Sequence, residues 1–262
     1  MKLTGVMLII ACLGIAGCAT QGSDGSGLKS ASDTSGDETS DRARARIHTE
    51  LAASYFELGN MGVALEEVRE ALRADQNYAP AHNVAGLVYS QLKEDGLAEE
   101  SFQRALSINP VDSDAHNNYG LFLCQRKQES EAIKHFMRAV RNPLYPNPDR
   151  SYVNAGVCAR RSGNNADAET YFQLALKMRP NQPQALYQMA DFSYARREYA
   201  EARHYLSRLT QVAAPSAEVL WLGVRTERRL GDRNGEASYA LQLRNRFPNS
   251  KETRALLAGQ YE

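Results

Sequence analysis

Small residues recur along the chain at nearly equal intervals of 34, 34, 36, 34 and 33 residues. Twelve positions after each of the first five stands an alanine, and four positions after that alanine stands a bulky apolar residue. In the last interval the matching pair is taken to be Ala237 and Leu241, which come two positions late. A period of this length predicts a tandem array of one supersecondary unit. The small residues are Ala52, Gly86, Gly120, Gly156, Ala190 and Gly223.

Each unit contains the residue types that two antiparallel helices need. Small side chains let the two backbones approach closely, and the bulky side chain fills the space beside them. Pro110 and Pro180 end the second helix of two units, because proline cannot continue a helix. One helix pair cannot bury its apolar face alone, so neighbouring pairs must stack into a continuous core.

This spacing resembles the tetratricopeptide repeat (TPR), a helix-turn-helix unit of about 34 residues. The resemblance implies an all-α fold: a right-handed superhelix of six TPR repeats with a short C-terminal capping helix, together spanning residues 45–262. The proline-rich loop at 142–148 is expected to change the twist of the stack, and residues 231–235 interrupt the spacing. The repeats are expected at about 45–78, 79–112, 113–148, 149–182, 183–215 and 216–249.

Residues 1–17 have the features of a secretory signal peptide, with a positively charged start and a short apolar run over residues 6–16. The sequence LGIAGC at residues 13–18 resembles the bacterial lipobox, which implies cleavage before Cys18 and a lipid on that cysteine. The alternative is an ordinary secretory signal with an incidental cysteine. An aspartate directly after the lipidated cysteine would resemble an inner-membrane retention signal, but this position is Ala19. The expected location is therefore the periplasmic face of the outer membrane of a Gram-negative bacterium.

Residues 18–44 are predicted to form a flexible tether behind the lipid, because they are rich in serine, glycine and aspartate and almost free of apolar side chains. The whole chain is 43% apolar and 24% charged, as in folded proteins. Its 31 basic and 31 acidic residues cancel, which argues against a nucleic-acid partner. No stretch is long and apolar enough for a membrane-spanning helix.

Candidate chemistry is sparse. His48, His82 and His116 are 34 residues apart, at the same position of three repeats, so a structural role is favoured over a metal cluster. No metalloprotease, paired-cysteine, nucleophile-elbow or phosphate-loop motif is present. The protein is therefore expected to be no enzyme and to use no metal, cofactor or small-molecule substrate, apart from the covalent lipid on Cys18.

Two of the four cysteines remain after the signal peptide is removed and Cys18 is lipidated. These are Cys124 and Cys158, near the ends of the first helices of the third and fourth repeats. First helices of adjacent repeats stack side by side, so a structural disulfide is a candidate in an oxidising compartment. Two buried free thiols are the alternative.

The binding surface of such an array is expected on the concave face, which the first helices line. No lysine stands at the groove positions, so a lysine clamp for a carboxylate is disfavoured. An extended segment or an amphipathic helix suits an apolar groove with asparagine donors. Helix-to-helix packing is the alternative for each residue. The candidates are Phe56, Asn83, Leu87, Asn117, Leu121, Val153, Val157, Tyr187 and Tyr194, flanked by Thr49 and Ala53.

Several longer strings of the sequence are more specific than the general repeat pattern requires. They are HNNYGLFLC at 116–124, NPLYP at 142–146, NAGVCA at 154–159, WLG at 221–223 and LQLRNRFPNS at 241–250. These strings resemble the type IV pilus biogenesis lipoproteins called PilF or PilW, over nearly all of the mature chain. Both repeat cysteines and the proline loop coincide with family positions.

The resemblance implies a pilotin, a lipoprotein that binds subunits of the secretin ring in the outer membrane and promotes their multimerisation or localisation for pilus biogenesis. A TPR lipoprotein that serves as scaffold for another envelope assembly complex is the main alternative. An enzyme with an unrecognised site is the third.

Overall fold

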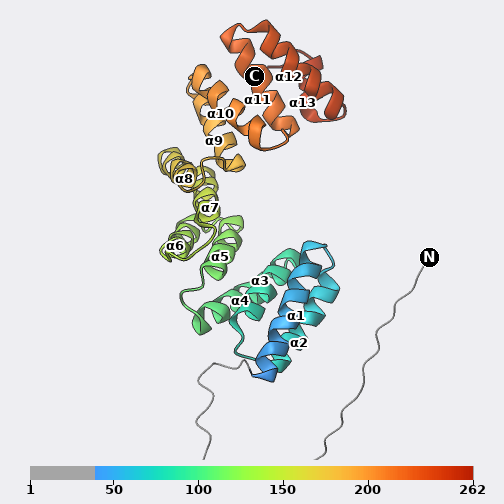
Figure 1. Ribbon diagram of the computed structural model, residues 1–262, viewed down its shortest axis with the longest axis vertical. Helices are drawn as coiled ribbons and strands as arrows, with labels where there is room; N and C mark the ends of the chain where they lie inside the picture. Colours follow the sequence, from blue (N-terminus) through green and yellow to red (C-terminus); the bar gives the residue numbers. More distant parts are fainter. Residues whose placement is uncertain (1–38, 262) are drawn as a thin grey trace, which may run out of the picture. The chain divides into compact units, whose positions relative to one another are not determined.

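The computed structural model describes residues 39–261, and over that range it contains thirteen helices and no strand (Figure 1). The predicted signal peptide, Cys18 and most of the predicted tether lie outside the described residues. The helices are α1 (Ser40–Glu57), α2 (Met61–Ala74), α3 (Ala79–Leu92), α4 (Asp95–Ile108), α5 (Ser113–Gln125), α6 (Glu129–Ala139), α7 (Pro148–Arg161), α8 (Asn165–Met178), α9 (Pro183–Ala195), α10 (Tyr199–Val212), α11 (Ala217–Leu230), α12 (Arg233–Arg246) and α13 (Lys251–Leu257).

The helices form six consecutive pairs, from α1 with α2 to α11 with α12, and each pair packs against the next. First helices also contact the first helices of neighbouring repeats, as α3 does with α1 and α5. The short α13 packs on α11 and α12. The predicted fold, an all-α TPR superhelix of six repeats with a capping helix, is confirmed.

The first helix begins earlier than the sequence suggested. It starts at Ser40, inside the segment predicted as tether, and Thr39 caps it by accepting a hydrogen bond from the backbone N–H of Arg42 at 3.3 Å. An ion pair of 2.7 Å between Arg44 and Asp41 supports this polar first turn. These residues have few apolar side chains, so the sequence pattern did not predict a helix here. The N-cap and the ion pair support the first turn instead.

The turn inside every helix pair contains one residue in the left-handed region, with φ between 62° and 83°. Three of these residues are glycines, and the other three are lysine or arginine. Glycine reaches this region without steric cost, whereas a side chain with a Cβ is strained there. The turn residues are Gly59, Lys93, Lys127, Gly163, Arg197 and Gly231.

The close approach of paired helices explains the recurring glycines. A Cβ at Gly86 or Gly120 would lie 2.7 Å from the ring of Phe102 or Phe136, which packs flat against the bare backbone. Each ring is buried and comes from the second helix of the same repeat. Repeats with alanine at this position carry an aliphatic residue instead, as with Ala190 beside Leu206.

The prediction that the spacing fails in the sixth repeat is wrong. Gly231 occupies the turn in step with the other repeats, and a Cβ at Gly223 would lie 2.7 Å from the ring of Tyr239. Tyr239, not Leu241, therefore fills the bulky position, and Leu241 is 52% exposed. Gly235 takes the place of the small residue on the second helix, twelve positions after Gly223 as in the other repeats.

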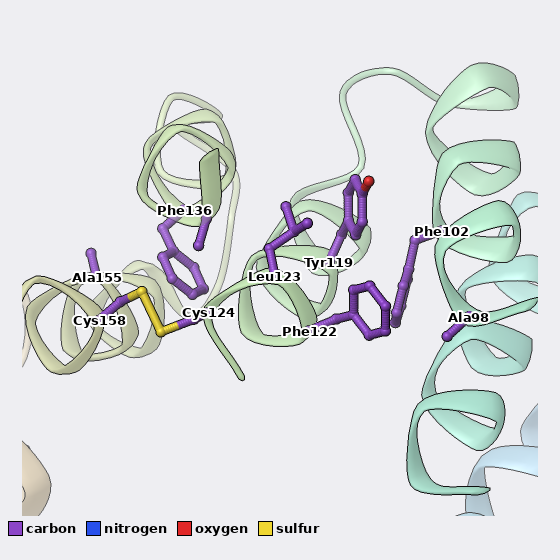
Figure 2. Packing of buried hydrophobic residues seen from close by; sticks show 10 residues of the cluster. Ala98, Phe102, Tyr119, Phe122, Leu123, Cys124, Phe136, Ala155 and Cys158 are labelled. Atoms are coloured by element: carbon purple, nitrogen blue, oxygen red, sulfur yellow. A yellow bond between two sulfur atoms is a disulfide. The ribbon is translucent and has the colours of Figure 1, made fainter. Parts of the chain in front are cut away.

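The third and fourth repeats are joined covalently. Cys124 near the end of α5 and Cys158 in α7 form a disulfide with a Cα–Cα distance of 5.9 Å. Both cysteines are buried, and Figure 2 shows Phe136 and Ala155 beside the bridge. The proline-rich loop between α6 and α7 buries Tyr145. A change of twist at this loop stays a prediction.

Candidate functional site

The first helices bring most of the predicted groove residues to the surface. Six of them are partly exposed and come from the first helices of the first five repeats. Each of the six packs against a buried cluster of its own or a neighbouring repeat, so its position is set by the core. We call these six the apolar face: Phe56, Leu87, Leu121, Val157, Tyr187 and Tyr194.

The structure gives the two predicted asparagine donors a different role. Asn117 is 3% exposed, and its Oδ1 accepts hydrogen bonds from Ser151 Oγ and Asn154 Nδ2, both at 2.9 Å. Asn118 donates to Asn83 Oδ1 at 3.2 Å. These side chains therefore link α3, α5 and α7 to one another, and Asn83 and Asn117 are not free to bind a partner segment.

Three residues of this polar network were missed from the sequence. Asn118 and Asn154 stand at the same position of the third and fourth repeats, a signal that could have identified them. Ser151, which is fully buried, matches Ala115 in the third repeat, so no recurring polar residue marks it in the sequence. Val153 and Thr49, two other groove candidates, are also buried, so they belong to the packing between helices.

The disulfide lies next to the apolar face. It joins α5, which carries Leu121, to α7, which carries Val157, and so holds these two side chains at a fixed spacing. Closing a loop of 34 residues stabilises the fold by about 3–4 kcal/mol in the chain-entropy model. A surface held rigid in this way loses less conformational entropy when a partner binds.

Charged side chains join the fourth repeat to the fifth. The guanidinium of Arg160 pairs with Asp191, donates to Gln188 Oε1 at 2.6 Å and lies over the Phe192 ring at 4.8 Å from its centroid. Burial raises the pKa of the Tyr187 hydroxyl, and the charge of Asp191 raises it further. The Tyr187 side chain is therefore a neutral phenol.

The histidines have structural partners. His48 Nδ1 lies 2.6 Å from Glu67, and His82 Nε2 lies 3.0 Å from the carbonyl oxygen of Gln76. His116 Nδ1 lies 2.9 Å from His135 Nδ1, and its Nε2 lies 3.0 Å from the Pro110 carbonyl oxygen. Burial lowers the pKa of both His116 and His135. No group of three His, Cys, Asp or Glu residues within 39–261 could hold a metal ion.

Helix pairs of this geometry, with an apolar face on their first helices, define a tetratricopeptide repeat protein. Models described as tetratricopeptide repeat match residues 49–113, 101–134 and 159–221. Among the residues that the structure describes, no helix is both long and apolar enough to cross a membrane.

Similarity to known proteins identifies a family within the tetratricopeptide repeat proteins. The type IV pilus assembly protein PilF of Pseudomonas aeruginosa is 33% identical over 252 residues, which cover 96% of this chain and 97% of PilF. A solved structure of Pseudomonas aeruginosa PilF matches with a TM-score of 0.76 at 32% identity, over 84% of this chain and 99% of the solved chain. The solved structure of PilW, described as a widely conserved type IV pilus biogenesis factor, matches with a TM-score of 0.72 at 31% identity. The match covers 81% of this chain and 98% of the solved PilW chain. The chain belongs to the PilF family of type IV pilus assembly proteins.

Proposed function

We propose that this protein is a pilotin: an outer-membrane lipoprotein, held by a lipid on Cys18, that binds secretin subunits and promotes their multimerisation or localisation for type IV pilus biogenesis. The apolar face carries the proposal. It offers six partly exposed apolar or aromatic side chains, each backed by the core of a repeat. Membership in the PilF family supplies the pilus context.

The mode of binding follows from the chemistry of the apolar face. Leu87, Leu121 and Val157 recur on successive first helices, so an extended segment or an amphipathic helix of the secretin has regularly spaced contacts. Tyr187 and Tyr194 add large rigid surfaces with a polar tip, a type of side chain that often anchors interfaces. Burial of apolar secretin residues here would keep them from aggregating before the ring closes.

A lipid on Cys18 would contribute through concentration rather than contact. Tethering the repeats at the membrane raises the effective concentration of any segment bound there. Each buried CH₂ group of the lipid adds about 0.8 kcal/mol to membrane affinity, so several acyl chains hold the protein firmly. The repeats would capture a secretin subunit, and the lipid would direct the complex to the outer membrane.

The test uses cells that lack the gene and carry either the wild-type protein or the double variant Leu87→Asp with Leu121→Asp. Outer membranes are probed for heat-resistant secretin multimers. We expect the multimers to vanish or to move to the inner membrane with the double variant. Leu97→Asp, which charges a more exposed apolar position on the second helix α4, is expected to leave them unchanged.

Two measurements complete the test. Thermal unfolding of the purified double variant establishes that its repeats remain folded. Direct binding of purified secretin segments to the wild-type protein then gives the affinity. Normal multimers in cells without the gene, together with defects elsewhere in the envelope, would instead support the scaffold of another assembly complex.

A further inference from the structure

A pocket that shares only Tyr194 with the apolar face lies near the C-terminal end of the described chain. It has a volume of about 650 Å³ and opens between α9, α11 and the residues that follow α13. Its charged lining comes from Arg225, Arg228 and Arg229, and its aromatic lining from Tyr194 and Tyr261. No Asp or Glu of residues 39–261 lines it, so the described lining of the pocket is basic.

Arg225 is held in place without an anion. Its guanidinium lies over the Tyr194 ring at 4.8 Å and over the Trp221 ring at 5.9 Å from the ring centroids. Its Nε is buried and has no hydrogen-bond partner among the described residues. No carboxylate of residues 39–261 lines the pocket, so the charge of this guanidinium is available to an acceptor that enters the pocket beside it.

Three arginines that lie over a ring or near this pocket pair with a carboxylate, whereas no carboxylate of residues 39–261 pairs with Arg225. Arg160 also lies over an aromatic ring, but it pairs with Asp191. Arg203 pairs with Glu227 in the repeat where Arg225 stands. Even within the pocket, Arg228 pairs with Glu236 at 3.0 Å.

The aromatic rings of the pocket pack on their neighbours. Tyr261 stacks on Trp221 with ring centroids 5.7 Å apart, and the guanidinium of Arg228 lies 3.9 Å from the Tyr261 centroid. A fork of N–H donors flanked by flat rings suits a planar carboxylate that has an aromatic or apolar side chain beside it. A bare phosphate would use the charge and leave the rings without contact.

We infer that this pocket is a recognition site for an acidic segment of a protein partner, in which a carboxylate binds Arg225 and an adjacent aromatic or apolar side chain packs on Tyr194 and Tyr261. The carboxylate accepts hydrogen bonds from the Arg225 guanidinium, and Arg228 and Arg229 add positive charge around it. The site does not depend on the partner being a secretin, and its test rests on Arg225, which is no part of the apolar face.

The test measures binding of a fluorescein-labelled peptide, Gly-Glu-Phe-Asp-Phe-Glu-Gly, to the purified lipoprotein in detergent by fluorescence anisotropy. The control peptide replaces every acid by its amide, as Gly-Gln-Phe-Asn-Phe-Gln-Gly. We expect Arg225→Gln to weaken binding of the acidic peptide at least tenfold, because a charge-assisted hydrogen bond is lost. Arg225→Lys retains the charge but not the fork, and several-fold weakening is expected.

Arg233→Gln is the matched control. It removes the same charge from an exposed position of the sixth repeat, at the start of α12, and is expected to leave the affinity unchanged. Thermal unfolding of each variant is measured alongside, and Arg225→Lys serves if Arg225→Gln does not fold. Equal binding of the two peptides, or equal effects of Arg225→Gln and Arg233→Gln, would overturn the inference. Displacement of the peptide by an equal concentration of inorganic phosphate would overturn it in favour of a phosphate site, such as one for lipid headgroups.

Discussion

The third and fourth repeats differ from the fifth in what holds them together, although all three follow the same helix-turn-helix plan. In the third and fourth repeats, the rings of Phe136 and Phe172 pack on glycine backbone, and a disulfide joins the two repeats. The buried Asn117 side chain adds hydrogen bonds between the same helices, which it accepts from Ser151 and Asn154. This region is held by buried and covalent contacts.

The fifth repeat uses aliphatic packing and charge. Ala190 and Leu206 take the places of glycine and phenylalanine. Ion pairs lead to both neighbours, a partly exposed one from Asp191 to Arg160 and one from the partly exposed Arg203 to the buried Glu227. Partly exposed pairs contribute less than buried contacts and are screened by salt. One repeat plan therefore tolerates two kinds of junction, with the stiffer one beside Leu121 and Val157 of the apolar face.

Removal of the disulfide is expected to have the largest effect on this difference. The variant Cys124→Ala with Cys158→Ala should lower the free energy of unfolding by about 3–4 kcal/mol, because the unfolded chain regains the freedom of a 34-residue loop. Urea unfolding followed by circular dichroism measures it. A reductant should destabilise the wild-type protein equally and leave the double variant unaffected. A loss below about 1 kcal/mol would mean that packing alone joins α5 to α7.

Filling the glycine contact is expected to have the next largest effect. A Cβ at Gly156 would lie 2.6 Å from the buried Phe172 ring, so Gly156→Ala should cost about 3 kcal/mol, at the upper end for overpacking. Adding Phe172→Leu should recover part of the loss, because it reproduces the alanine-leucine pair of the fifth repeat. Ala190→Gly is the reverse change and should cost only about 1 kcal/mol, from helix propensity. Equal costs at Gly156 and Ala190 would contradict the comparison.

Acid should weaken the third repeat in particular. Burial, followed by repulsion from His116 and Arg138, lowers the pKa of His135 from 6.5 to about 4. Between pH 6.5 and about 4, the unfolded chain binds a proton at this residue that the folded chain does not, so roughly 3 kcal/mol of stability is lost as pH falls through that window. Unfolding at several pH values measures this loss. His135→Gln should flatten the dependence, whereas His204→Gln, an exposed position of the fifth repeat, should not.

The sequence was sufficient where a local pattern repeats. Small and bulky residues in fixed register predicted six helix pairs and a cap, because each pair meets the same packing problem. The sequence was insufficient where residues of unexpected type occupy the small and bulky positions of a repeat. Gly235 and Tyr239 take the roles assigned to Ala237 and Leu241, and a search for alanine and leucine passed over them.

The candidate site was predicted only in part, because the sequence shows the pattern within a repeat but not the contacts between repeats. Position within the first helix identified the partly exposed members of the apolar face. The burial of Asn83 and Asn117 depends on hydrogen bonds between repeats, which the pattern of one repeat does not reveal. The pocket around Arg225 depends on the chain after α13 folding back onto α11, which places Tyr261 beside Trp221.

The smallest expected effect tests a feature that both regions share. Lys127 in the third repeat and Arg197 in the fifth occupy the left-handed turn, where the fourth repeat has Gly163. Lys127→Gly and Arg197→Gly should each stabilise by about 0.5–1 kcal/mol, because relief of the Cβ strain exceeds the added entropy of the unfolded chain. Gly163→Lys should destabilise by a similar amount, and thermal unfolding of the three variants measures all of these changes. The two gains should be equal, since the turns are alike. A larger gain in the third repeat would mean that its rigid junction also strains the turn, and the contrast between regions would then extend to their backbones.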